Sequence, residues 1–133
     1  MAITKKPWGS LEKLEGPEAG ERLELLIITL GPKSSTELWR SRMGQVYLTP
    51  LEGFSELVEL KSDEDFTSDL QFEPTKTLYA TDEPRHIGGG RRFRIMNPTS
   101  DQLTKILVAN YGVTELETVT DHEGNLKTKP STH

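Results

Sequence analysis

The stretch Arg91-Arg92-Phe93-Arg94-Ile95-Met96 has the clearest two-residue period in the chain. Alternate side chains of a β-strand point to opposite faces of its sheet. Phe93 and Ile95 are therefore expected on a face that meets a core, and Arg92 and Arg94 on a face that meets water. The residues that follow, Asn-Pro-Thr-Ser-Asp at 97–101, are typical of a tight turn. The stretch predicts a half-buried strand that ends in a turn.

Short apolar segments with similar boundaries lie on both sides of this strand. The segment 36–43 fits both a helix and a strand, so its assignment stays open. The segments 45–49 and 54–60 are separated by the turn-forming Leu51-Glu52-Gly53 and resemble a hairpin. Further strands are predicted at 22–30, 77–80, 105–109 and 113–119. Many short strands, with turns about every 8–12 residues, favour an all-β antiparallel sandwich or jelly roll.

The length and composition fit a single domain of this kind. The chain has 133 residues, with 11 glycines and 8 prolines, which suits many short elements joined by turns. We expect an extended N-terminal arm at 1–20, a jelly-roll domain at 21–120 and a polar C-terminal tail at 121–133. Long arms on a jelly roll are what a scaffold, virion-decorating or cement protein would use. They favour a homo-oligomer or a larger protein assembly.

Charge, cysteine content and hydropathy exclude several classes of protein. The 21 acidic and 16 basic residues give a net charge of −5, opposite to that of a nucleic-acid binder. The chain has no cysteine, which excludes disulfides, a thiolate nucleophile and cysteine-ligated metals. The longest apolar run, 23–30, is too short to span a membrane, and residues 1–7 lack the apolar core of a secretory signal. We expect a cytoplasmic protein that binds neither membrane nor nucleic acid.

The stretch Lys6-Pro7-Trp8-Gly9-Ser10 resembles the opening motif of a known family of cupin domains. These are the cupin domains of type II mannose-6-phosphate isomerases and sugar-nucleotide pyrophosphorylases. Further family landmarks follow in the family's order, at 31–33, 51–54, 87–98 and 101–109. A longer, acidic segment between residues 54 and 79 looks like an insertion. The resemblance covers nearly the whole chain and implies a single cupin-like jelly roll.

The resemblance also implies where a metal would be held. Family members bind a metal with side chains from two motifs, and the matching positions here are Trp39, Ser41, Val46 and Phe93. Indole, isopropyl and phenyl groups cannot donate to a divalent ion, and a lone serine hydroxyl is a poor ligand. We therefore expect no metal and no other cofactor, and we expect Phe93, Trp39 and Val46 to fill the space as core. The alternative is a dry, aromatic-lined pocket for a small ligand.

Four arginines and three glycines crowd the segment 85–94 of an otherwise acidic chain. Its candidate binding residues are Arg85, His86, Gly88, Gly89, Gly90, Arg91, Arg92 and Arg94. Amides of consecutive glycines can approach an anion, and arginines can bind phosphate or carboxylate, but neither the P-loop nor the dinucleotide spacing is present. The alternative is a tight turn whose arginines are solvated or pair with acids of a neighbouring subunit. We favour pairing between subunits, because arginine is common at interfaces.

Two functions are consistent with these residues. The first, and our prediction, is a non-catalytic, metal-free cupin-like module that has a structural or protein-interaction role in a homo-oligomer. The second, which the resemblance implies, is binding or isomerisation of a phosphosugar or nucleotide sugar, with His86, Arg91 and Arg92 contacting the anion. A metal-independent epimerase would need a barrel-facing histidine base and a tyrosine acid. His86 is the only candidate base, with Tyr47 or Tyr79 as the acid.

Overall fold

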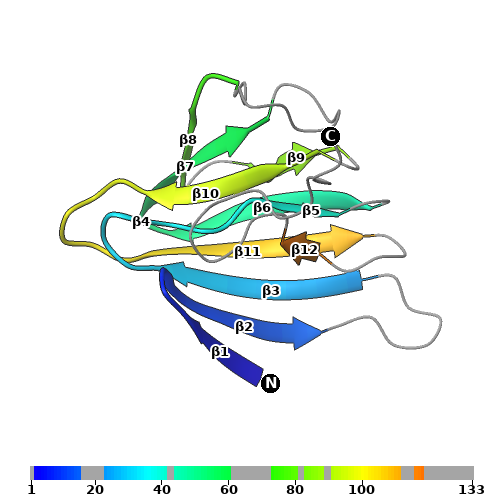
Figure 1. Ribbon diagram of the computed structural model, residues 1–133, viewed down its shortest axis with the longest axis horizontal. Helices are drawn as coiled ribbons and strands as arrows, with labels where there is room; N and C mark the ends of the chain where they lie inside the picture. Colours follow the sequence, from blue (N-terminus) through cyan, green and yellow to red (C-terminus); the bar gives the residue numbers. More distant parts are fainter. Residues whose placement is uncertain are drawn as a thin grey trace, which may run out of the picture.

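The computed structural model describes residues 2–15, 23–41, 44–60, 73–80, 83–88, 91–111 and 116–118. Across these ranges every regular element is a β-strand, and the strands form two antiparallel sheets (Figure 1). The described part of the chain contains no helix that could cross a membrane. The prediction of an all-β antiparallel sandwich is confirmed.

The first sheet holds six strands in the order β1-β2-β3-β11-β6-β9. In that order the strands are Ala2–Lys6, Gly9–Glu15, Leu23–Leu30, Thr104–Tyr111, Gln45–Glu52 and Arg85–Ile87. The second sheet has the order β12-β5-β10-β7-β8, and β4 also pairs with β10. Its strands are Leu116–Thr118, Trp39–Ser41, Phe93–Asn97, Phe54–Glu59 and Lys76–Tyr79, with Ser34–Ser35 as β4. Strands that are distant in sequence are therefore neighbours, as β3 and β11 show in Figure 1.

Alternation along the strands builds one core between the two sheets. On β3, Leu26, Ile28 and Leu30 point inward and are at most 3% exposed, while the intervening residues are half-buried. On β11, Ile106 and Val108 point inward in the same way. The second sheet contributes Leu57, Leu78, Phe93 and Ile95 to the same cluster. Burial of these apolar side chains from both sheets provides the main favourable free energy of folding.

Most predicted strands are present, with small shifts at their ends. The segments predicted at 22–30, 45–49, 54–60, 77–80 and 105–109 lie in β3, β6, β7, β8 and β11. Phe93 and Ile95 are both fully buried, as their alternation predicts. The open segment 36–43 contains the strand β5, and its described residues include no helix. Of the segment 113–119 the structure describes β12, which pairs with β5.

The hairpin predicted for the segments 45–49 and 54–60 is wrong. β6 pairs with β11 and β9, whereas β7 pairs with β10 and β8 in the other sheet. Gly53, with a φ of +71°, turns the chain from one sheet to the other, and a Cβ there would lie 2.9 Å from the Leu103 carbonyl oxygen. Both strands bury one face in the same core. Their alternation therefore fits two strands that face each other across the core as well as two strands that pair side by side.

The N-terminal segment forms part of the first sheet. β1 and β2 make an antiparallel hairpin, and β2 pairs with β3. Trp8, in the turn of this hairpin, packs in the core, and a Cβ on Gly9 would collide with the Thr29 carbonyl oxygen. From sequence we predicted only an extended arm at 1–20, because the mixed charged and apolar residues of β2 hide its alternation. The tail predicted at 121–133 lies outside the described residues.

Candidate functional site

The interior positions that the resemblance assigns to metal ligands are packed with apolar side chains. Trp39 on β5, Val46 on β6 and Phe93 on β10 are at most 3% exposed and belong to the core cluster. Phe93 lies opposite Trp39 in the strand register, and their rings meet edge to face with centroids 6.3 Å apart. Trp8 also meets Trp39 edge to face, with ring centroids 5.8 Å apart. Three aromatic rings therefore pack in series inside the sandwich.

These side chains do not fit a metal ion. Trp39, Val46 and Phe93 offer no oxygen, sulfur or imidazole donor. Ser41 is 2% exposed, and its Oγ has no hydrogen-bond partner among the described residues. A Cβ on Gly44 would collide with that Oγ, so the backbone lies close against it. Nor do the described ranges contain a group of three or more histidine, aspartate or glutamate side chains that could hold a metal.

The basic segment 85–94 is divided between the two sheets. Arg85 and His86 lie on β9 of the first sheet. Arg91 and Arg92 precede β10 of the second sheet, and Arg94 lies within it. Gly88 follows β9, while Gly89 and Gly90 fall outside the described residues. The segment carries the chain from one sheet to the other, and its basic side chains do not all share one sheet face.

Arg91 is engaged within its own chain. Its Nη2 donates a hydrogen bond to the Leu60 carbonyl oxygen at 2.9 Å, and its Nε lies 3.2 Å from Glu59 Oε1. Lys76 Nζ approaches the other oxygen of the same carboxylate, also at 3.2 Å. Glu59 is 6% exposed. Two cations therefore balance the charge of a carboxylate that is nearly buried.

Arg92 does not face water as the alternation predicts. The side chain is 4% exposed, whereas Arg94 is half-buried on the outer face of the second sheet. The strand begins at Phe93, so Arg92 lies before the regular alternation and its direction is not set by the sheet. The Arg92 carbonyl oxygen instead accepts a hydrogen bond from the Leu60 backbone N–H at 2.9 Å.

His86 points away from the core. It lies opposite Tyr47 in the register of β6 and β9, and the two rings are 4.9 Å apart with a tilt of 31°. Its Nε2 donates a hydrogen bond to Gln45 Oε1. Tyr79 lies on β8 of the second sheet, against Phe54. The barrel-facing base required of a metal-independent epimerase is therefore not supplied by His86, and the structure does not bring His86 together with Arg91 and Arg92.

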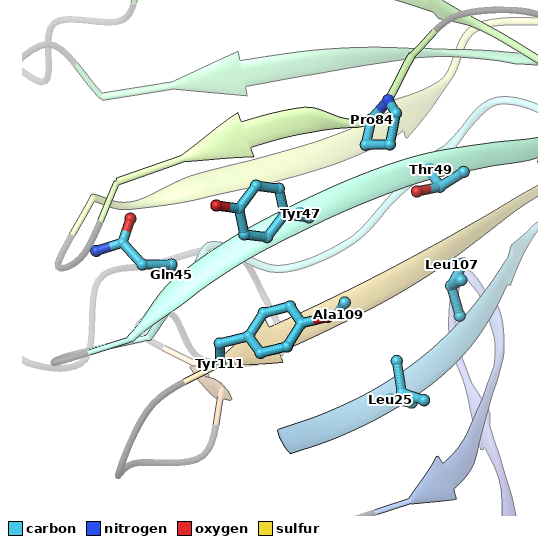
Figure 2. A pocket seen from close by; sticks show the side chains of 8 residues that line it. All are labelled: Leu25, Gln45, Tyr47, Thr49, Pro84, Leu107, Ala109 and Tyr111. Carbon is cyan, nitrogen blue, oxygen red and sulfur yellow. The ribbon is translucent and has the colours of Figure 1, made fainter. Parts of the chain in front are cut away.

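Sequence reasoning missed an apolar groove on the outer face of the first sheet. The groove has a volume of about 580 Å³. We call it the outer groove. Figure 2 shows the residues that line it, which are Leu25, Gln45, Tyr47, Thr49, Pro84, Leu107, Ala109 and Tyr111. The rings of Tyr47 and Tyr111 meet edge to face at 5.7 Å, and the two residues are 37% and 49% exposed. None of the eight lining residues is charged.

The outer groove has a signal in the sequence. β3 and β11 carry apolar residues on both faces, because Leu25 and Leu107 alternate with the buried residues of the core. A strand that is apolar on both faces is expected to be covered on both faces. The apolar run 23–30 therefore holds a signal for an apolar outer face as well as for a strand.

Comparisons with known proteins detect the fold but no sequence relative. No family model and no curated protein matches the chain. The formate complex of Lactobacillus farciminis oxalate decarboxylase matches with a TM-score of 0.66, at 13% identity over 89% of this chain and 33% of that one. Staphylococcus aureus CapF, a capsular polysaccharide assembling protein, gives 0.65, at 12% identity over 86% and 29%. Peruvianin-I, a cysteine peptidase from Thevetia peruviana latex, gives 0.66, at 17% identity over 90% and 72%.

The chain has a cupin-like jelly-roll fold. The single antiparallel jelly roll predicted from sequence is thereby confirmed. Identities of this size establish the fold of the cupin-like domain and nothing about its chemistry. The domain spans about a third of the length of the oxalate decarboxylase that it matches.

Proposed function

We propose that this cupin-like domain is a non-catalytic, metal-free interaction module that assembles with copies of itself through the outer groove. The observation that carries the proposal is the packing at Trp39, Val46 and Phe93. These side chains occupy the interior where the resemblance puts a metal, and they have no donor atoms. The filling of that position leaves no room for the metal and supports a role for the outer surface of the molecule.

The lack of charge in the outer groove favours a second copy of the chain as its partner. In a two-fold symmetric interface the same surface patch of each copy meets the other, so a patch with a net charge repels its copy. The chain carries a net charge of −5, yet the groove residues are all neutral. Exposed tyrosines are common at interfaces because they bury a large apolar area and keep a hydroxyl for hydrogen bonding. The groove is therefore suited to meet itself.

The sequence resembles the cupin domains of mannose-6-phosphate isomerases and sugar-nucleotide pyrophosphorylases. This resemblance fits the proposal if the chain is a relative that has lost the metal ligands. In such a domain the ligand positions Trp39, Ser41, Val46 and Phe93 have changed to core residues while the strands that carry them are kept. Strands β5, β6 and β10 do carry these four residues, and all four are buried. We propose that the strands retain a structural role after the metal chemistry has been lost.

Light scattering on the purified chain, with metal analysis of the same peak, tests the proposal. We expect a metal-free oligomer. The double variant Tyr47→Lys with Leu107→Lys places charges in the groove and is expected to convert the oligomer to a monomer. The control is Tyr79→Lys, a tyrosine of the second sheet that is 54% exposed, and it should leave the mass unchanged. A wild-type monomer at every concentration, or stoichiometric metal in the peak, would overturn the proposal.

A further inference from the structure

A second pocket, unlike the outer groove, lies between the two sheets at one edge. Strands β1, β2 and β3 of the first sheet supply one wall, and β5 and β12 of the second sheet supply the other. Its volume is about 250 Å³. We call this cavity the edge pocket. The residues that line it are Thr4, Lys6, Leu11, Lys13, Glu24, Leu26, Trp39, Leu116 and Thr118. The pocket therefore combines an apolar wall with polar and charged groups that could orient a ligand.

The carboxylate of Glu24 is held firmly at the pocket wall. Glu24 is 4% exposed, and its Oε1 accepts hydrogen bonds from Asn110 Nδ2 and from the Leu116 backbone N–H, both at 3.0 Å. Lys13 Nζ lies 3.6 Å from Oε2. A carboxylate with these partners is already satisfied. It contributes a fixed negative charge to the pocket and is not needed to hold a ligand.

Lys6 supplies the charge that is not balanced. It is half-buried at the end of β1, and its ammonium group makes no hydrogen bond or ion pair with any residue in the described part of the chain. Two lysines and one glutamate line the edge pocket. Their formal charges sum to a single positive charge, in a chain whose net charge is −5. A half-enclosed cation with an apolar wall beside it attracts a small anion.

We infer that the edge pocket binds a small organic monoanion, a carboxylate on an apolar ring. Lys6 would bind the carboxylate, and the hydroxyls of Thr4 and Thr118 lie on the same lining to complete its hydrogen bonds. Trp39, Leu11 and Leu116 would pack against the ring. One unbalanced positive charge, with the fixed charge of Glu24 nearby, matches a monoanion better than a doubly charged phosphate. The volume fits a ligand smaller than a drug-sized molecule.

Titration calorimetry with benzoate as the probe tests this inference. A ligand of this size is expected to bind with a dissociation constant of about 1 mM, and benzamide, which has no charge, should bind at least about tenfold more weakly. Lys6→Gln should weaken benzoate binding by the same factor. The control Lys5→Gln removes the adjacent lysine of β1, which is exposed and pairs in register with Ser10, and it should leave binding unchanged.

Four results would overturn the inference. The first two are no benzoate binding at about 10 mM, ten times the expected dissociation constant, and equal binding of benzoate and benzamide. The other two are binding by inorganic phosphate that is tighter than by benzoate, and unchanged affinity in Lys6→Gln. Circular dichroism of both lysine variants shows whether each is folded, and Thr118→Leu, which fills the pocket without removing a charge, provides a second way to abolish binding. The inference does not depend on self-association, because the outer groove lies on the opposite face of the first sheet.

Discussion

Phe93 is the largest of the fully buried side chains in the described part of the chain. Its ring is fully buried and contacts Trp39 edge to face. Truncation of such a ring leaves a cavity, so Phe93→Ala is expected to lower the free energy of unfolding by about 3–5 kcal/mol. Urea denaturation followed by tryptophan fluorescence measures this loss. Leu103→Ala, at a leucine that is 52% exposed, is the control and should change stability by no more than about 0.5 kcal/mol. A loss at Phe93 as small as this would contradict a packed interior.

For single residues, the sequence predicts burial where the residue lies in a strand with a clear two-residue period. Phe93 and Ile95 have the period of a strand, and both are buried as expected. Arg92 belongs to the same stretch of sequence but precedes the strand, so the period does not apply to it. The unbalanced Lys6 could not be found from sequence, because its importance depends on Trp39 and Thr118, which lie far along the chain.

The ion pairs around Glu59 connect the strands of the second sheet. Glu59 ends β7, Lys76 begins β8, and Arg91 lies just before β10. Arg91→Met removes one cation from a carboxylate that is 6% exposed, and it is expected to cost about 1–3 kcal/mol in urea denaturation. The control is Arg40→Met. Arg40 pairs with Glu117 at 2.7 Å, but that glutamate side chain is 37% exposed, so we expect a loss of at most about 1 kcal/mol.

The same variant separates two roles for the arginines. An arginine that pairs within its chain affects stability, and one that pairs with a neighbouring subunit affects the oligomer mass. We expect Arg91→Met to lower stability and leave the mass unchanged. A loss of mass without a loss of stability would support the contact between subunits that we predicted from the sequence.

The sequence does not show which strands lie side by side in a sheet. β6 and β7 each have a clear alternation and a glycine between them, yet they belong to different sheets. β9 is not predicted from the sequence, because Arg85-His86-Ile87 is too short to show a period. Alternation gives the face of a strand that is buried. It does not give the neighbour, which depends on which other strands compete for the same edge.

For the whole molecule, salt distinguishes the proposed interface from one built on charge. Arginine–carboxylate contacts between subunits weaken as salt rises, because the screening length falls from about 10 Å at 0.1 M to about 3 Å at 1 M. The outer groove has no charged residue, and salt also screens the repulsion between chains that each carry a net charge of −5. We therefore expect the oligomer mass to be constant or to rise between about 0.1 M and about 1 M sodium chloride. Sedimentation velocity at both concentrations measures it. A fall in mass at high salt would place the interface on charged residues outside the groove, and the Tyr47→Lys with Leu107→Lys variant would then keep the wild-type mass at low salt.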